Sequence, residues 1–137
     1  MNLLTNETIL DLTLRMILGI LFFFQGYDKI FRIKMTGVID TFKFELGNIK
    51  FPNFLLVISA YYTSYVELIG GLFLVAGLFT NYTLYLIGID LILVTGAFSL
   101  IKPVWDMNLI FPRLILWSIL MIIPESFNKI SIDFFIK

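Results

Sequence analysis

The chain has 137 residues, of which 59% are hydrophobic and 15% are charged, and its formal net charge is zero. With a mean hydropathy of +0.95, it has too few polar residues to cover the surface of a soluble domain of this size. The length fits a single domain, residues 1–137, and the hydropathy predicts that this domain lies in a lipid bilayer. The zero net charge and lipid-facing surface argue against nucleic acid as a partner. The absence of cysteine and histidine excludes thiol chemistry, thiolate-bound metals and histidine-ligated haem.

Four apolar stretches predict membrane-spanning helices, because about 20 apolar residues rising 1.5 Å each cross a bilayer. The first three, Leu12–Phe31, Phe54–Phe79 and Tyr82–Ile101, are long enough. The fourth, Met107–Pro124, contains Pro112 near its start. This proline either kinks a spanning helix or starts a helix that is too short to cross.

The segment Arg32–Asn53, between the first two stretches, has apolar residues at helical spacing. Because Lys43 and Glu45 fall off that apolar face, we expect an amphipathic helix lying in the membrane interface. The linkers between the later stretches are short, so consecutive helices are expected to be antiparallel neighbours. The expected fold class is an all-α membrane protein, a four-transmembrane-helix bundle with an interfacial helix between helices 1 and 2. The apolar face consists of Met35, Val38, Ile39, Phe42 and Leu46.

The distribution of lysine and arginine predicts the orientation in the membrane. The side of the long loop carries Lys29, Arg32, Lys34, Lys43, Lys50 and Lys102. The side of the two termini carries Arg15, Lys129 and Lys137. We therefore expect a multi-pass protein of the bacterial inner membrane, with the long loop in the cytoplasm and both termini outside.

Each predicted span contains a charged residue that a bilayer disfavours. Glu67 and Asp90 lie near the middle of the second and third spans, Arg113 lies in the fourth, and Arg15 lies near the start of the first. A carboxylate at mid-membrane costs about 2.5–3.5 kcal/mol, so these acids and bases are expected to pair inside the bundle. Glu67 is expected to face inward, within reach of Arg15 or Arg113, and the depths favour Arg113 as the partner of Glu67 or Asp90. Such pairs either fix helix register or belong to a ligand site.

The charges lie on helical stripes of small and apolar residues, which are typical of helix interfaces in membranes. The first stripe is Arg15, Gly19, Phe22, Gly26 and Lys29, and the second is Ala60, Ser64, Glu67, Gly70, Gly71, Leu74 and Gly77. Asp106, Arg113, Trp117 and Leu120 share a face at the fourth span. The glycines expected to pack helices closely are Gly19, Gly26, Gly70, Gly71 and Gly77.

Two of these stretches resemble the DoxX family of small four-helix membrane proteins. They are "RMILGILFFFQGYDKIF" (Arg15–Phe31) and "ELIGGLFLVAGLFTNYT" (Glu67–Thr83), and the closing "SID" (Ser131–Asp133) is similar to a family ending. Many relatives carry a basic residue after the "GLFT" turn, where this chain has Asn81. The resemblance implies a membrane subunit of a redox-linked complex, since the family takes its name from a subunit of a thiosulfate:quinone oxidoreductase.

Two classes of function fit these observations. The first is a quinone-interacting subunit that is not an enzyme alone, has no intrinsic cofactor or metal and depends on partner subunits for its electron carrier. The second is a structural or assembly subunit of a larger membrane complex, with no chemistry of its own; transport of a small molecule or proton is a weaker third hypothesis. The candidate polar cluster for a quinone or proton site is Glu67, Arg113, Arg15, Asp90, Gln25, Tyr27 and Lys29.

Overall fold

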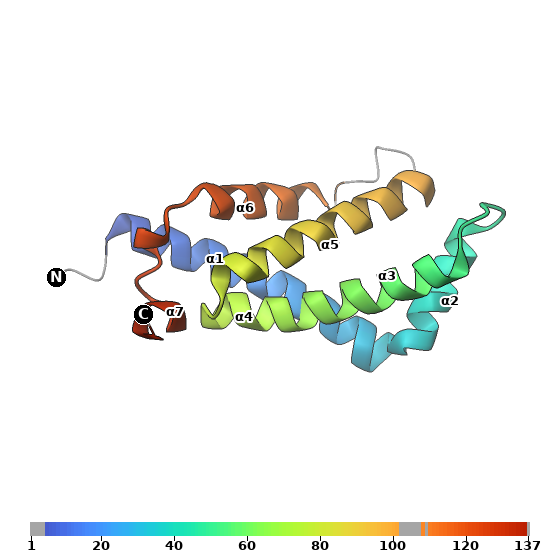
Figure 1. Ribbon diagram of the computed structural model, residues 1–137, viewed down its shortest axis with the longest axis horizontal. Helices are drawn as coiled ribbons and strands as arrows, with labels where there is room; N and C mark the ends of the chain where they lie inside the picture. The colour runs from blue at the N-terminus through green and yellow to red at the C-terminus, as the bar shows by residue number, and fades with distance from the viewer. Residues whose placement is uncertain (1–4, 102–107, 109, 137) are drawn as a thin grey trace.

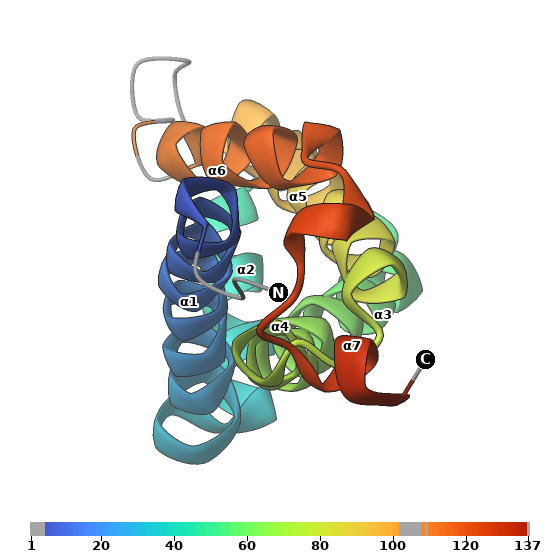
Figure 2. The same ribbon diagram turned by 90° about the vertical axis from the view of Figure 1, so that its left-hand side faces the viewer.

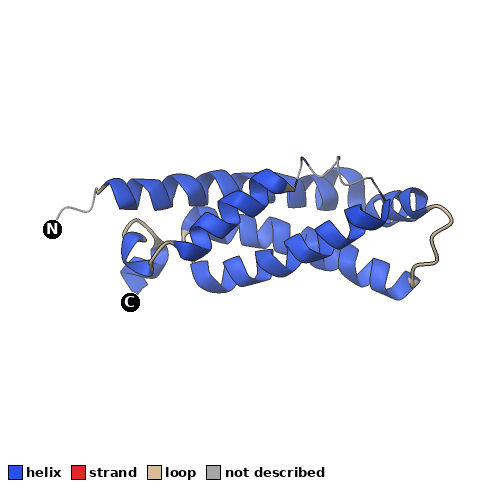
Figure 3. Cartoon of the chain, turned by 90° about the horizontal axis from the view of Figure 1, so that it is seen from above, coloured by secondary structure: helices blue, strands red, loops and turns tan. Residues whose placement is uncertain are grey.

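The computed structural model describes residues 5–101, 108 and 110–136, and within these ranges the chain is helical and contains no strand (Figure 3). Successive helical runs travel in alternating directions along the long axis (Figure 1). The expectation of antiparallel neighbours is therefore confirmed.

The first helical run begins with α1 (Asn6–Tyr27), which continues into a π-helical turn, η1 (Asp28–Ile33), and then into α2 (Lys34–Leu46). The Thr5 hydroxyl caps α1 by accepting a hydrogen bond from the Thr8 backbone N–H at 3.3 Å. At Lys34 the backbone turns, with a φ of +64°, and α2 packs against the start of α3 (Asn53–Tyr65) (Figure 1).

The second run consists of α3, a second π-helical turn, η2 (Val66–Gly70), and α4 (Gly71–Ala76). Gly77 ends this run in the left-handed conformation, with φ +66° and ψ +42°. The Leu78 N–H then donates to the Phe73 carbonyl at 2.9 Å, which satisfies one of the helix's last carbonyl groups. The chain turns sharply and enters α5 (Thr80–Ile101).

The C-terminal part contains α6 (Phe111–Ile122), a 3₁₀ turn, η4 (Glu125–Phe127), and α7 (Ile132–Ile136). Pro112 stands in the first turn of α6, where its missing N–H removes no helical hydrogen bond. It therefore starts the helix, and among the described residues the alternative of a kinked span is wrong. Met107, the first residue of the predicted span, lies outside the described residues.

The number of membrane crossings follows from helix length. Three helical runs, Asn6–Leu46, Asn53–Ala76 and Thr80–Leu100, are long and apolar enough to cross a membrane. The 12 residues of α6 extend about 18 Å at 1.5 Å per residue, which is shorter than a hydrocarbon core of about 30 Å. The fourth crossing stays a prediction, as does the interfacial position of α2.

Seen along the long axis, α1, α6, α5 and the α3–α4 run surround a common centre (Figure 2). The two predicted stripes face this centre, since every member is buried except Lys29, which is half-buried. The predicted apolar face of α2 is also confirmed, because all five of its residues are buried or half-buried while their neighbours Lys43 and Glu45 are exposed. The buried apolar core is Leu14, Leu18, Phe22, Leu74, Leu84, Ile87, Leu91, Ile110 and Leu120.

Glycines bring α1 into backbone contact with the η2–α4 run. A Cβ on Gly26 would lie 2.2 Å from the Leu68 backbone nitrogen, and a Cβ on Gly71 would lie 2.3 Å from the Phe23 backbone nitrogen. Neither helix can accept a side chain there without moving apart. Gly70 differs from the expectation, because it faces α5 and has room for a Cβ, with its nearest neighbours at 3.5 Å.

The adjacent pair Gly70 and Gly71 provides a matched test of this contact. We expect Gly71→Ala to lower the free energy of unfolding by about 1–3 kcal/mol, because the new Cβ overpacks the α1 backbone. Gly70→Ala places its Cβ at ordinary contact distance and is expected to leave it unchanged or raise it by up to about 1 kcal/mol, the difference in helix propensity between glycine and alanine. Denaturant titration of the purified protein in micelles, followed by circular dichroism, measures both. Equal losses for the two variants would contradict the close contact.

Candidate functional site: a charge cluster beside a cavity

Glu67 and Lys29 form a buried ion pair between the two π-helical turns. The Lys29 Nζ atom lies 2.7 Å from Glu67 Oε2, and the exposed fractions of the two side chains are 22% and 2%. π-Helical turns are rare and often occur at functional sites. Each member of this pair lies on such a turn, Lys29 on η1 and Glu67 on η2.

The prediction that Glu67 faces inward is confirmed, whereas the prediction of Arg15 or Arg113 as its ion-pair partner is wrong. The reason lies in the glycine contact. Gly26 touches the backbone at Leu68, so Lys29, three residues further along, is brought directly to Glu67. Arg15 lies 14 residues before Lys29, about 21 Å away along the helix.

Asp90 and Arg113 complete the cluster without pairing with each other. Asp90 is 1% exposed, and neither of its carboxyl oxygens has a hydrogen-bond partner among the described residues. It lies close enough to Glu67, Lys29 and Arg113 to interact with them electrostatically. The Arg113 guanidinium instead lies 5.9 Å from the centre of the Phe22 ring, and within the described part of the chain it forms no ion pair.

A cavity of about 460 Å³ opens beside this cluster. Four of the candidate polar residues line it: Gln25, Lys29, Glu67 and Arg113. The Gln25 side-chain oxygen is buried and has no partner among the residues described. The remaining lining is mostly apolar and comes from α2, the loop after it, α3, α5 and the start of α6, including Phe42, Leu46, Phe51, Leu56, Val94, Ala97, Phe98 and Ile110.

Three candidate residues do not line this cavity: Asp90, Tyr27 and Arg15. Tyr27 is 38% exposed and its ring centre lies 4.8 Å from that of Phe31, so its predicted place in the polar cluster is wrong. It follows Gly26 by one position and therefore points about 100° away from the buried stripe.

Sequence reasoning also missed Ser59, Thr63 and Glu45, which line the cavity. The helical spacing of Ser59 and Thr63 before Glu67 was the available signal.

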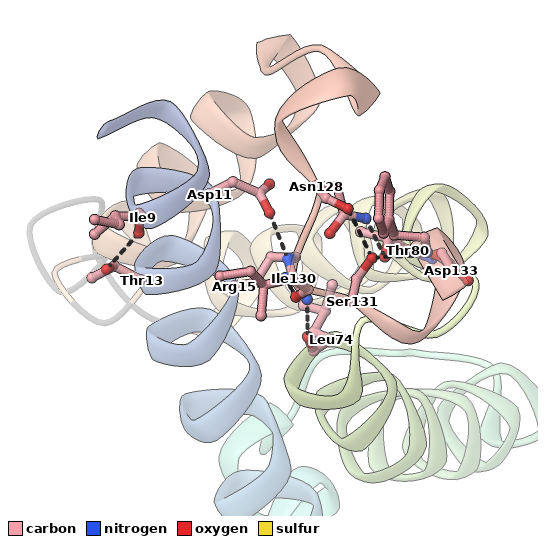
Figure 4. Close-up of polar contacts among 11 residues, drawn as sticks. Ile9, Asp11, Thr13, Arg15, Leu74, Thr80, Asn128, Ile130, Ser131 and Asp133 are labelled. Atoms are coloured by element: carbon pink, nitrogen blue, oxygen red, sulfur yellow. Dashed lines mark hydrogen bonds and ion pairs between the residues drawn. The ribbon is translucent and has the colours of Figure 1, made fainter. Parts of the chain in front are cut away.

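Arg15 belongs to a second polar cluster at the other end of α1 (Figure 4). Its Nε atom lies 2.8 Å from Asp11 Oδ2, Nη1 donates to the Leu74 carbonyl at 3.2 Å, and Nη2 donates to the Ile130 carbonyl at 2.7 Å. The side chain is fully buried, with an exposed fraction of 0% for the residue. This arginine therefore joins α1 to the end of α4 and to the C-terminal segment.

The closing "SID" segment holds the turn between α4 and α5 (Figure 4). The Asp133 carboxylate accepts hydrogen bonds from the backbone N–H groups of Phe79 and Thr80 at 2.7 and 2.8 Å, and from the Thr80 hydroxyl at 2.9 Å. It thereby caps the start of α5 from 53 residues away in the sequence. The Asp133 N–H also donates to the Gly77 carbonyl at 2.9 Å. Asn81, the departure from the family pattern, donates to the Glu125 carboxylate.

These features define a small helical membrane protein with charges buried between its helices. The chain belongs to the DoxX family, whose model matches residues 10–100. No curated protein and no solved structure matches it. The family assignment thus confirms the resemblance, while the roles of the candidate site residues stay predictions.

The Asp133 cap is expected to stabilise the fold. Asp133→Ala removes the acceptor for two backbone N–H groups at the start of α5 and should lower the free energy of unfolding by about 1–2 kcal/mol. Asp40→Ala, which removes an exposed carboxylate from α2, is the control and should have little effect. Denaturant titration in micelles measures both, and unchanged stability of Asp133→Ala would contradict the capping role.

Replacing Lys29 and replacing Glu67 should lower the free energy of unfolding by different amounts. Lys29→Met leaves a carboxylate that is 2% exposed without its partner. We therefore expect the free energy of unfolding to fall by an amount near the upper end of about 3–5 kcal/mol. Glu67→Leu strands a lysine that keeps 22% of its surface exposed, and its loss should lie near the lower end. The double variant replaces both charges by apolar groups and should recover most of the loss. Additive losses in this double-mutant cycle would show that the residues do not interact.

Proposed function

We propose that the chain is a quinone-binding membrane subunit of a redox-linked complex. One observation carries the proposal: a cavity of about 460 Å³ that is mainly apolar and has Gln25, Lys29, Glu67 and Arg113 among its few polar lining residues. Ligand sites for small molecules typically measure about 300–1,000 Å³ and combine apolar walls with a few convergent polar groups. This cavity has both properties.

The lining fits the chemistry of a quinone headgroup. A quinone presents two carbonyl oxygens on a flat apolar ring, and Lys29, Arg113 and the Gln25 amide provide hydrogen-bond donors for such oxygens. Phe42, Phe98 and the aliphatic side chains provide the surface for the ring and its apolar tail. When bound, a quinone would supply the acceptor for two electrons and two protons.

The chain's own residues would bind the headgroup and manage protons. Arg113, which has no ion-pair partner among the described residues, would orient one carbonyl oxygen. The Lys29–Glu67 pair would hold a proton near the ligand and keep the cluster's charges balanced. Electrons must come from a partner subunit, because the sequence has no cysteine or histidine to bind a redox centre.

The same proposal includes a position in the membrane. We place the chain in the bacterial inner membrane with the basic segment around α2 in the cytoplasm and both termini outside. In that orientation the cavity lies near the cytoplasmic side, since Phe42 and Leu46 of α2 contribute to its wall.

Quinone content and quinone binding test the proposed function. Lipid extracts of the native complex, purified in lipid nanodiscs, are expected to contain quinone, and Glu67→Gln and Arg113→Gln should each weaken binding at least about tenfold, the effect of losing about 1.4 kcal/mol. Asp28→Asn is the matched control, because this surface carboxylate lies in η1 and pairs with exposed Arg32. A wild-type complex without quinone, together with unchanged turnover in Glu67→Gln, would favour the assembly-subunit hypothesis.

A further inference from the structure

Asp90 lies on α5 at about the level of Glu67 on the neighbouring helical run. Gly70 faces Thr83 and Ile87 of α5, and α5 runs antiparallel to the α3–α4 run (Figure 1). Moving one helical turn back from Gly70 reaches Glu67, and moving one turn forward from Ile87 on α5 reaches the level of Asp90. Glu67 lines the cavity and Asp90 does not, and the two carboxyl groups are close enough to interact electrostatically.

The environment of Asp90 favours the neutral acid on geometric grounds. It is 1% exposed, and its two carboxyl oxygens accept no hydrogen bond from any residue that the structure describes. A buried carboxylate without donors is costly, and a second carboxylate close by adds repulsion. The charged and titratable groups that act on it are Glu67 of η2, Lys29 of η1 and Arg113 of α6, and it in turn acts on Tyr62 of α3. Lys29 is already paired with Glu67, and Arg113 forms no ion pair with Asp90.

The charge balance of the cluster has a consequence for reduction chemistry. With Asp90 neutral, Lys29, Arg113 and Glu67 together carry one net positive charge. Such a charge beside the cavity stabilises the negative charge that develops on a ligand oxygen when an electron arrives. Once Asp90 gives up its proton, the four groups sum to zero, and both cations lie near enough to stabilise the new carboxylate.

We propose that Asp90 stores a proton and, acting through Glu67, supplies one of the two protons that a quinone takes up on reduction. This inference rests on the proposed function. The O–H bond of Asp90 breaks and a new O–H bond forms on the Glu67 carboxylate; Glu67 then transfers a proton to a ligand oxygen and is restored as a carboxylate. Two electrons come from a reduced carrier in a partner subunit. The second proton, and the one that later restores Asp90, enter from water past exposed Glu45 at the cavity wall. Asp90 therefore acts through Glu67 and does not touch the ligand.

The first measurement needs neither the quinone nor the partner subunit. The chain is labelled with ¹³C at the aspartate carboxyl carbons in lipid nanodiscs, and its carbon spectrum is recorded as a function of pH. We expect one neutral aspartic acid signal at pH 7, which disappears in Asp90→Asn and persists in Asp40→Asn. A wild-type spectrum with every aspartate ionised at pH 7 would overturn the inference, and this result does not depend on whether Asp90→Asn folds.

The second measurement uses the native complex and separates this inference from the proposed function. Quinone occupancy of Asp90→Asn should equal that of the wild type, whereas the rate of quinone reduction should fall about 100-fold and lose its dependence on pH, as expected for a missing proton donor. Asp90→Glu should restore most of the rate. If Asp90→Asn binds quinone and reduces it at the wild-type rate, the proton-donor role of Asp90 is overturned while the proposed function stands. Absence of quinone from the wild-type complex would overturn the proposed function and this inference with it.

Discussion

The close contact between α1 and the η2–α4 run is the constraint on which the rest of the structure depends. It exists because Gly26 and Gly71 leave no side chain between the two backbones. A basic residue of the first helical run stands at each end of this contact, Arg15 of α1 at one and Lys29 of η1 at the other. Both reach the same neighbouring helix, Arg15 at the Leu74 carbonyl and Lys29 at Glu67. The glycine contact thus fixes the helix register and both polar clusters together.

The two clusters differ in a way that separates structure from function. Around Arg15, three guanidinium nitrogens have partners at 2.7–3.2 Å, and the group closes the end of the bundle. Around Glu67, by contrast, the described residues leave the oxygens of Gln25 and Asp90 without partners, and the cluster borders a cavity. Because native proteins satisfy most buried polar groups, exceptions call for an explanation such as a ligand or a proton-transfer role. The hydrogen bonds of Arg15 are explained by the fold alone, whereas the unpartnered oxygens of Gln25 and Asp90 are not.

Much of the fold could be predicted from the sequence, because burial follows helical periodicity. The stripes containing Gly19, Gly26 and Glu67 face the interior as their spacing indicates, and so does the apolar face of α2. The ion-pair partner of Glu67 could not be predicted in this way, since it depends on the depth at which two helices touch and on two π-helical turns that no sequence pattern marked. The Asp133 cap was equally inaccessible, because it joins residues 53 positions apart that only the tertiary fold brings together.

The position of Asp90 has a thermodynamic implication for the whole bundle. Replacing buried charged groups by apolar residues of similar size often stabilises a protein, so a chain shaped by stability alone would gain by exchanging Asp90 for leucine. Keeping an unpaired acid there requires compensation elsewhere. The Arg15 cluster and the Asp133 cap lie at the α4–α5 end, away from the cavity lining, and the glycine contact joins α1 to the η2–α4 run. These contacts stabilise the bundle without involving Asp90, so the cavity end can carry a polar group that packing does not require.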